Sequence, residues 1–307
     1  MKKIISTFLI ILFIFPTMVF ASDTVLVDNE ITDIAPNAKS AILIEATTGK
    51  IIYEKNSHEK LAPASMTKIM SMLLIMENID KGVIKWNDKV TASANASSMG
   101  GSQILLETGE QMTVYDLFKG IAVASGNDAV VALSEYIAGS EEEFVNLMNQ
   151  KVKELGLKDT VFKNPHGLDT ANHYSSAYDM SIIAKELVKH EKVFEFTSIY
   201  EDYLRKGTKR ELWLVNTNKL VRFNPIVDGL KTGYTKEAGY CLTATAKKND
   251  MRLISVVMGE PDTKVRSSET TSLLDYGFAK YKAMKVVDKN TVIGKLKIEK
   301  ASNKNVN

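Results

Sequence analysis

The sequence predicts an α+β fold in which an antiparallel sheet is flanked by helices, with a mostly helical subdomain inserted at about residues 90–200. Two observations predict this fold: strand-like segments lie near both ends of the chain, and helical patterns fill the part between them. The strand-like segments are 40–45, 50–54, 226–233, 240–247 and 251–258. The first two flank a turn at 46–49 and form a hairpin, and Lys248-Asn249-Asp250 joins the last two.

Helices are predicted from capping residues and from apolar spacing. A buried helix is expected from Pro63 to about Asp80, because proline suits the first helical turn and residues 69–76 are apolar almost all round. Residues 113–116 resemble a capping box. Apolar side chains at i, i+3 and i+4 predict helices at 141–155, at 176–190 and from about Ser267 to Met284.

The composition is that of an ordinary globular protein. The chain has 307 residues, with 39 Lys and Arg against 37 Asp and Glu and a formal net charge of +2. This balance gives no electrostatic support to a nucleic-acid-binding role. Cys241 is the single cysteine, which excludes an internal disulfide, and its apolar neighbours predict that it is buried in the protein.

Residues 1–21 read as a secretory signal peptide. Two lysines precede an apolar run at 8–15, and small residues at the −3 and −1 sites favour cleavage before Ser22. The run is shorter than the roughly 20 residues that span a bilayer, so an uncleaved anchor is the less favoured alternative. We therefore expect an exported, extracytoplasmic protein with its main domain at 22–285. A short basic tail follows at 286–307; solvation of this tail is favoured over attachment to membrane or anionic wall polymer, and membrane association stays open.

Three short motifs can carry chemistry: Ser65-Met66-Thr67-Lys68, Ser125-Gly126-Asn127 and Lys231-Thr232-Gly233. Each is weak alone, and the chain holds decoys of the first two at 57–60 and 93–95. Position separates Ser65 from the decoy Ser57. Ser65 and Lys68 fall in the first turn of the predicted buried helix, three residues apart and therefore on one face.

The first turn of a helix suits a nucleophilic serine. Its free N–H groups and positive dipole end favour an anion that develops beside the hydroxyl. A partly buried lysine near a second cation has a lowered pKa and can remove the serine proton. The plain alternatives are a capping Ser65 with a solvent-reaching Lys68, a helix end at Gly126 with a cap at Asn127, and turn residues at 231–233.

The order and context of the three motifs match the set found in penicillin-binding proteins and serine β-lactamases. At these residues the chain resembles the serine D-alanyl-D-alanine carboxypeptidases, the low-molecular-mass penicillin-binding proteins, over roughly residues 35–285. The strings that carry the resemblance are 62–68, Asn164-Pro165-His166-Gly167-Leu168-Asp169, 227–235 and 238–241. The resemblance implies the penicillin-binding-protein and serine β-lactamase fold, with 22–285 as the catalytic domain. Many family members carry a further β-rich domain and a terminal membrane anchor, for which the residues after Lys285 are too few.

The same resemblance implies a role for each motif residue. Ser65 would attack the carbonyl between two terminal D-alanines with Lys68 as general base, and the acyl-enzyme would then be hydrolysed. Ser125 and Lys231 would relay a proton to the departing D-alanine. The remaining implied roles are peptide binding by Asn127, carboxylate binding by Thr232 in the Lys231-Thr232-Gly233 motif, an oxyanion hole from the backbone N–H groups of Ser65 and Tyr234, and a further carboxylate grip by Arg266. The plain alternative for Arg266 is a solvated helix residue.

The implied partners are peptidoglycan stem peptides that end in D-Ala-D-Ala, and β-lactams as covalent inhibitors; no nucleic acid, metal or cofactor is expected.

A serine β-lactamase is disfavoured because no Glu-x-x-Leu-Asn string lies between Ser125 and Lys231. A β-lactam sensor would need a membrane segment after the signal peptide. Ser-His-Asp and metallopeptidase readings lack their motifs, and a structural role is expected for His166. Endopeptidase action on existing cross-links uses the same chemistry and stays open.

Overall fold

The computed structural model describes residues 33–284, 286–287 and 291. The predicted signal peptide and almost all of the predicted basic tail lie outside these residues. The described chain from Ile34 onward belongs to one compact unit. None of its helices is both long enough and apolar enough to cross a bilayer.

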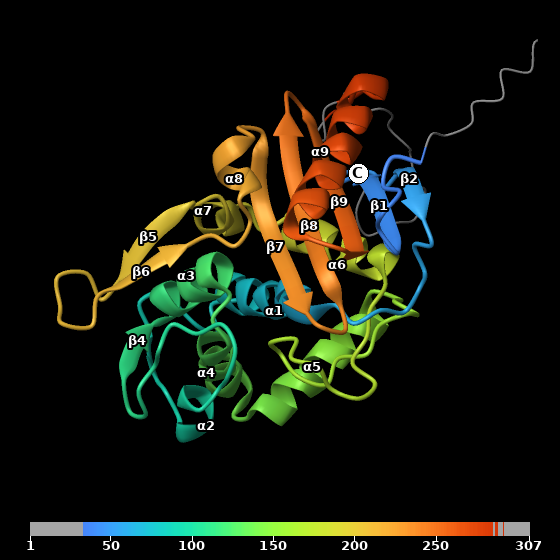
Figure 1. Cartoon of the computed structure of the whole chain (residues 1–307). Helices are drawn as coiled ribbons and strands as arrows, with labels where there is room; N and C mark the ends of the chain where they lie inside the picture. The colour runs from blue at the N-terminus through green and yellow to red at the C-terminus, as the bar shows by residue number, and fades with distance from the viewer. Residues whose placement is uncertain (1–32, 285, 288–290, 292–307) are drawn as a thin grey trace, which may run out of the picture. The chain divides into compact units, whose positions relative to one another are not determined.

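A five-stranded antiparallel sheet forms the centre of this unit (Figure 1). Its strands follow the order β2-β1-β9-β8-β7, and each neighbouring pair is antiparallel. The bounds are β1 Ser40–Glu45, β2 Ile51–Lys55, β7 Val227–Thr235, β8 Gly239–Lys248 and β9 Met251–Glu260. All five strands coincide with predicted segments, so the antiparallel sheet is confirmed.

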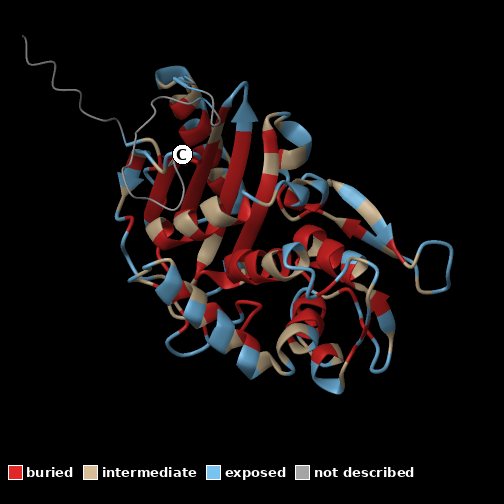
Figure 2. Ribbon diagram, turned by 180° about the vertical axis from the view of Figure 1, so that it is seen from behind, coloured by how far each residue is buried: buried red, intermediate tan, exposed pale blue. Residues whose placement is uncertain are grey.

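Both faces of the sheet are covered, which explains why its inner strands are apolar almost throughout. Successive side chains of a strand point to opposite faces. In β1, Ala41 and Leu43 belong to one apolar cluster with α9 (Thr263–Lys280), whereas Ile42 and Ile44 belong to the other cluster. That second cluster contains α1 (Lys68–Asp80) and α6 (Ala177–Leu187). Figure 2 shows that the strands of the sheet are largely buried.

Between β2 and β7 the regular structure is mainly helical, in line with the helical patterns predicted at about 110–200. The helices of this part, besides α1 and α6, are η1 Ala64–Thr67, α2 Ala94–Ser97, α3 Val114–Ala124, α4 Asn127–Ala138, α5 Glu141–Glu154, η2 Glu191–Val193, α7 Phe194–Thr197 and α8 Leu220–Phe223. The predicted cap of α3 is confirmed, because the Thr113 side chain accepts a hydrogen bond from the Asp116 N–H. Two small two-stranded sheets were not predicted, since their strands have only three or four residues: β3 Lys89–Thr91 with β4 Gln111–Thr113, and β5 Glu201–Leu204 with β6 Leu212–Val215.

The last helix begins four residues earlier than predicted, at Thr263, because the Asp262 side chain caps it by accepting from the N–H groups of Lys264 and Val265. It ends at Lys280 rather than near Met284. Cys241 is buried as predicted, and burial raises the pKa of its thiol to about 11. The earlier start places Arg266 inside the first turn of α9, which matters for the site.

Candidate active site

Ser65 lies in η1 (Ala64–Thr67), a 3-10 turn that leads directly into α1. Backbone from two other segments presses against this turn. A Cβ atom at Gly167 would lie 1.9 Å from the Ala64 carbonyl oxygen, and one at Gly233 would lie 2.7 Å from the Pro63 carbonyl oxygen. Only glycine allows such close approach, so the two glycines hold the turn between the 164–168 loop and β7.

Lys68 begins α1 and its side chain is completely buried. Its Nζ lies 3.0 Å from Ser65 Oγ, so the predicted pairing of the two side chains is present. Two carbonyl oxygens accept hydrogen bonds from the same nitrogen, Asn127 Oδ1 at 2.6 Å and the His166 backbone oxygen at 2.6 Å. The amine is therefore fixed on three sides.

The electrostatic surroundings disfavour a charged Lys68. Burial lowers its pKa well below the usual value, the nearby Lys231 ammonium lowers it further, and Asp128 opposes this only in part. Burial, with the positive charge of Arg266, lowers the pKa of Lys231 to about 7. Two lysines with depressed pKa values near a serine hydroxyl provide a base and a second proton carrier near neutral pH.

The second motif joins α3 to α4. Ser125 ends α3 in the left-handed conformation with φ 65°, and Gly126 is the residue that precedes α4. The expected helix end at Gly126 and cap at Asn127 therefore fall one residue too late. Asn127 is anchored on both sides, because its backbone N–H donates to the Ser102 carbonyl and its Nδ2 donates to the Gly100 carbonyl, each at 2.7 Å.

The third motif lies on β7, beside η1. Lys231 is buried and its Nζ donates to the Thr232 carbonyl at 3.1 Å. Thr232 Oγ1 donates to Thr217 Oγ1 at 2.7 Å. Tyr234 is 56% exposed and stacks on Tyr240, with 4.3 Å between the ring centroids. This strand end therefore brings hydroxyl and aromatic groups to the rim of the site.

A cleft of about 510 Å³ connects these segments. Six of the predicted site residues line it: Ser65, Ser125, Thr232, Gly233, Tyr234 and Arg266. The other three, Lys68, Asn127 and Lys231, are buried beneath that surface. All nine gather around one site, although they come from four separate segments of the chain.

Arg266 is buried rather than solvated, with a relative exposure of 5%. Burial lowers the pKa of its guanidinium. Its Nε is buried and has no hydrogen-bond partner within the described part of the chain. A buried, unsatisfied donor that borders a cleft is poised for an anionic ligand.

Several lining residues were not predicted: Ser102, Val215, Asn216, Thr217, Lys219, Tyr240 and Thr263. Most lie in loops or at strand ends that carry no motif. The His166 carbonyl was also missed, because a backbone acceptor has no residue signature. The decoys serve other purposes: Ser57 Oγ donates to Glu54 Oε2 at 2.8 Å, and Ser93 caps α2.

The peptidase S11 family, described as D-alanyl-D-alanine carboxypeptidase, matches residues 27–262. The chain is 56% identical over 306 residues to D-alanyl-D-alanine carboxypeptidase DacF of Bacillus subtilis, covering 99% of this chain and 78% of that protein. It is 41% identical over 249 residues to D-alanyl-D-alanine carboxypeptidase DacA of Escherichia coli, covering 79% of this chain and 61% of that protein.

Solved structures agree with the sequence relatives. Penicillin-binding protein 5 of Haemophilus influenzae superposes with a TM-score of 0.79 at 36% identity, over 88% of this chain and 79% of that one. This similarity confirms the expected penicillin-binding-protein fold. The chain belongs to the peptidase S11 family, the D-alanyl-D-alanine carboxypeptidases.

Proposed function

We propose that this protein is a serine-type D-alanyl-D-alanine carboxypeptidase that removes the terminal D-alanine of peptidoglycan stem peptides through an acyl-enzyme on Ser65. One observation carries the proposal: the buried Lys68 amine lies 3.0 Å from the Ser65 hydroxyl oxygen, at a cleft that Ser65 and Arg266 both line. Family membership supports the same activity.

Lys68 is suited to accept the serine proton. A neutral amine has two N–H groups and one lone pair. The Asn127 and His166 oxygens, each at 2.6 Å, take the two N–H groups, which leaves the lone pair for the Ser65 hydroxyl. The lowered pKa of Lys68 favours this neutral form. As the proton moves to Lys68, Ser65 Oγ bonds to the carbonyl carbon between the two D-alanines.

The remaining roles follow the positions around Ser65. The backbone N–H groups of Ser65 and Tyr234 stabilise the oxyanion, a contribution usually worth about 3–4 kcal/mol for each donor removed. Ser125 and Lys231 deliver the proton to the departing amine as the C–N bond breaks. Water then cleaves the acyl ester. A β-lactam carbonyl acylates the same hydroxyl, but its amine stays attached, so the covalent adduct persists.

The enzyme selects its substrate by the carboxyl terminus of the peptide. Thr232 and Gly233 border the cleft next to Arg266, whose unpartnered Nε provides a donor for the terminal carboxylate. Asn127 binds the peptide part of the substrate beside Lys68. The predicted signal peptide at 1–21 supports export, so the reaction takes place outside the cytoplasm. It limits the donors available for cross-linking and thereby contributes to peptidoglycan maturation and cell shape.

Labelling with a fluorescent penicillin tests the assignment. Ser65→Ala is expected to abolish both labelling and D-alanine release from a pentapeptide ending in D-Ala-D-Ala. Ser57→Ala is the matched control, because Ser57 belongs to a second Ser-x-x-Lys string but bonds to Glu54, and it should label like the parent protein. Undiminished labelling of Ser65→Ala would disprove the assignment.

A further inference from the structure

The position of the Lys68 amine depends on the His166 carbonyl. A lysine carries its nitrogen on a flexible four-carbon stem, so the nitrogen is placed by the groups to which it donates. Asn127 provides one acceptor and the His166 backbone oxygen provides the other, at 2.6 Å. A shift of the His166 carbonyl would remove one of the acceptors that place the amine beside Ser65. What holds His166 therefore bears on the reaction.

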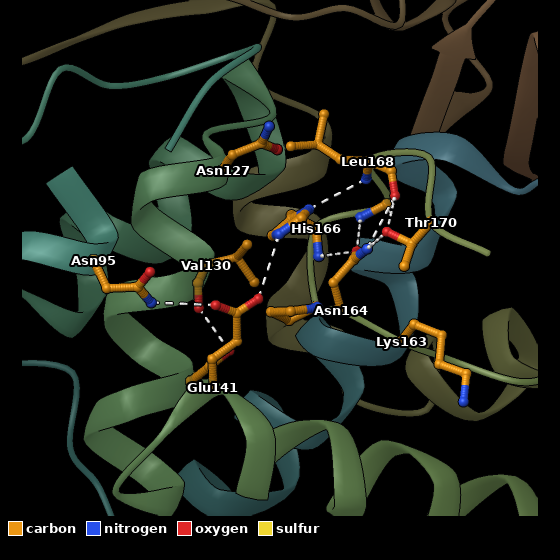
Figure 3. A network of polar contacts seen from close by, with 12 residues as sticks. Asn95, Asn127, Val130, Glu141, Lys163, Asn164, His166, Leu168 and Thr170 are labelled. Atoms are coloured by element: carbon orange, nitrogen blue, oxygen red, sulfur yellow. Dashed lines mark hydrogen bonds and ion pairs between the residues drawn. The ribbon is translucent and has the colours of Figure 1, made fainter. Parts of the chain in front are cut away.

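The His166 ring is held at both nitrogens (Figure 3). Nδ1 lies 3.2 Å from the Leu168 backbone nitrogen, which donates to it. In the neutral ring the proton therefore resides on Nε2, which lies 3.4 Å from Glu141 Oε1. The ring itself is nearly buried, with 8% of the side chain exposed, and it does not line the cleft.

Glu141 differs from the other acidic residues at the start of α5. Glu142 and Glu143 share the first helical turn but are exposed. Glu141 instead turns toward the 164–168 loop, and its second oxygen, Oε2, accepts a hydrogen bond from Asn95 Nδ2 at 3.2 Å. The bond with His166 is the main cause that lowers the pKa of the Glu141 carboxyl. The residue thus links α2, α5 and the loop.

Other contacts of the loop do not replace this link. Asn164 Oδ1 accepts from the Gly167 N–H at 2.6 Å and shapes the loop from within. Ser71 Oγ donates to the Pro165 carbonyl at 2.6 Å and ties the loop to α1. The Glu141 contact ties the loop to the helices on its other side, so it opposes movement of the His166 carbonyl away from Lys68.

We propose that Glu141 and His166 form a positioning pair that holds the His166 carbonyl, and through it the Lys68 amine, in line with the Ser65 hydroxyl. The inference rests on the proposed function, because it concerns the acylation of Ser65. Neither side chain of the pair touches the substrate. Loss of the pair should therefore slow acylation and leave binding of the peptide end unchanged.

The test compares three substitutions by the rate of labelling with fluorescent penicillin and by kcat and KM for D-alanine release. Glu141→Ala should lower the acylation rate at saturating penicillin, and kcat/KM for the peptide, on the order of tenfold, because small displacements of a catalytic group are costly. Glu141→Gln should stay within about twofold of the parent, since its amide oxygen accepts the same N–H. Glu142→Ala removes an equal charge from the same turn and should have no effect.

Rates are measured well below the unfolding temperature of every variant, so that a change in rate does not come from unfolding. Equal acylation rates for Glu141→Ala and Glu142→Ala would overturn the positioning pair, as would a loss in Glu141→Ala that disappears at saturating penicillin. Ser65→Ala is carried alongside: if it is still labelled, the proposed function fails. If it is unlabelled while Glu141→Ala reacts at full speed, only the pair fails.

Discussion

The two buried lysines of the cleft lie in contrasting surroundings. Lys68, at the start of a helix, is fixed by acceptors from α4 and from the 164–168 loop, and by the Ser65 hydroxyl. Lys231, on β7, donates to the carbonyl of its own neighbour Thr232. Both have depressed pKa values. In the proposed mechanism, the helix side supplies a fixed proton acceptor and the strand side supplies a second proton carrier.

The largest effect is expected at Lys68. Lys68→Ala removes the acceptor of the serine proton, so acylation by penicillin should fall by roughly 10⁴-fold, as for other nucleophile and base pairs. Stopped-flow or gel-based labelling measures this rate. Lys60→Ala, in the decoy motif, is the matched control. If Lys68→Ala retained more than a tenth of the parent rate, the helix side would not provide the base.

A smaller but more informative effect is expected at Lys231. Lys231→Met should lower kcat/KM by about 10²–10³-fold, because the proton carrier near the leaving group is lost. The pH profile sharpens the comparison. In the parent protein the rate should fall at low pH as Lys68 gains a proton, and fall again above about 7 as Lys231 loses its proton. In the Lys231→Met variant the fall in rate above about pH 7 should be absent. If that fall remained, Lys231 would not be the group that causes it.

The same variant should be more stable than the parent at neutral pH. The folded-state pKa of Lys231 is lowered from 10.5 to about 7, so between these values the unfolded chain binds the proton more readily. The free energy of unfolding therefore decreases as pH falls through this window. Lys231→Met removes this cost, which amounts to a few kcal/mol at pH 7.5. Calorimetry should show a higher Tm for Lys231→Met than for the parent at pH 7.5, and the difference between the two should shrink toward pH 10. A lower Tm for the variant at pH 7.5 would show that burial of Lys231 does not destabilise the parent.

The smallest effect is expected at the end of the cleft. Arg266→Gln removes a charged donor from the carboxylate site, and a hydrogen bond to a charged group is worth about 1.5–3 kcal/mol, or roughly 10–100-fold in kcat/KM. The loss should appear with a peptide that ends in free D-alanine. It should vanish with the same peptide amidated at its end. An equal loss of kcat/KM on both peptides would show that Arg266 stabilises the fold and does not bind the carboxylate.

Patterned elements could be predicted from the sequence. The strand segments are separated by turn residues, and the apolar stretch at 69–76 indicated a buried helix, so the strands and α1 could be predicted. The pairing of β1 with β9, which are far apart in the sequence, was not predicted. The three motifs are local strings, and their order identified Ser65, Lys68, Ser125 and Lys231. Arg266 was found only through the family resemblance.

The remaining parts depend on tertiary contacts. The His166 carbonyl belongs to the backbone, and the residue type at this position does not predict that it accepts a hydrogen bond from Lys68. Thr217 enters the cleft because Thr232 bonds to it, not because of a local pattern. Glu141 reads as one of three helix-start acids, and only the packing of α5 against the loop separates it from Glu142. Strands of three or four residues are too short for periodicity to be detected.

The buried Cys241 has a practical consequence. It is the one thiol in the sequence, it is fully shielded, and its high pKa keeps it protonated at neutral pH, so maleimide reagents have no accessible target on the native protein. A cysteine introduced at an exposed position would therefore react alone. The native chain is ready for fluorophores or spin labels placed one at a time around the cleft, without prior removal of its own sulfur.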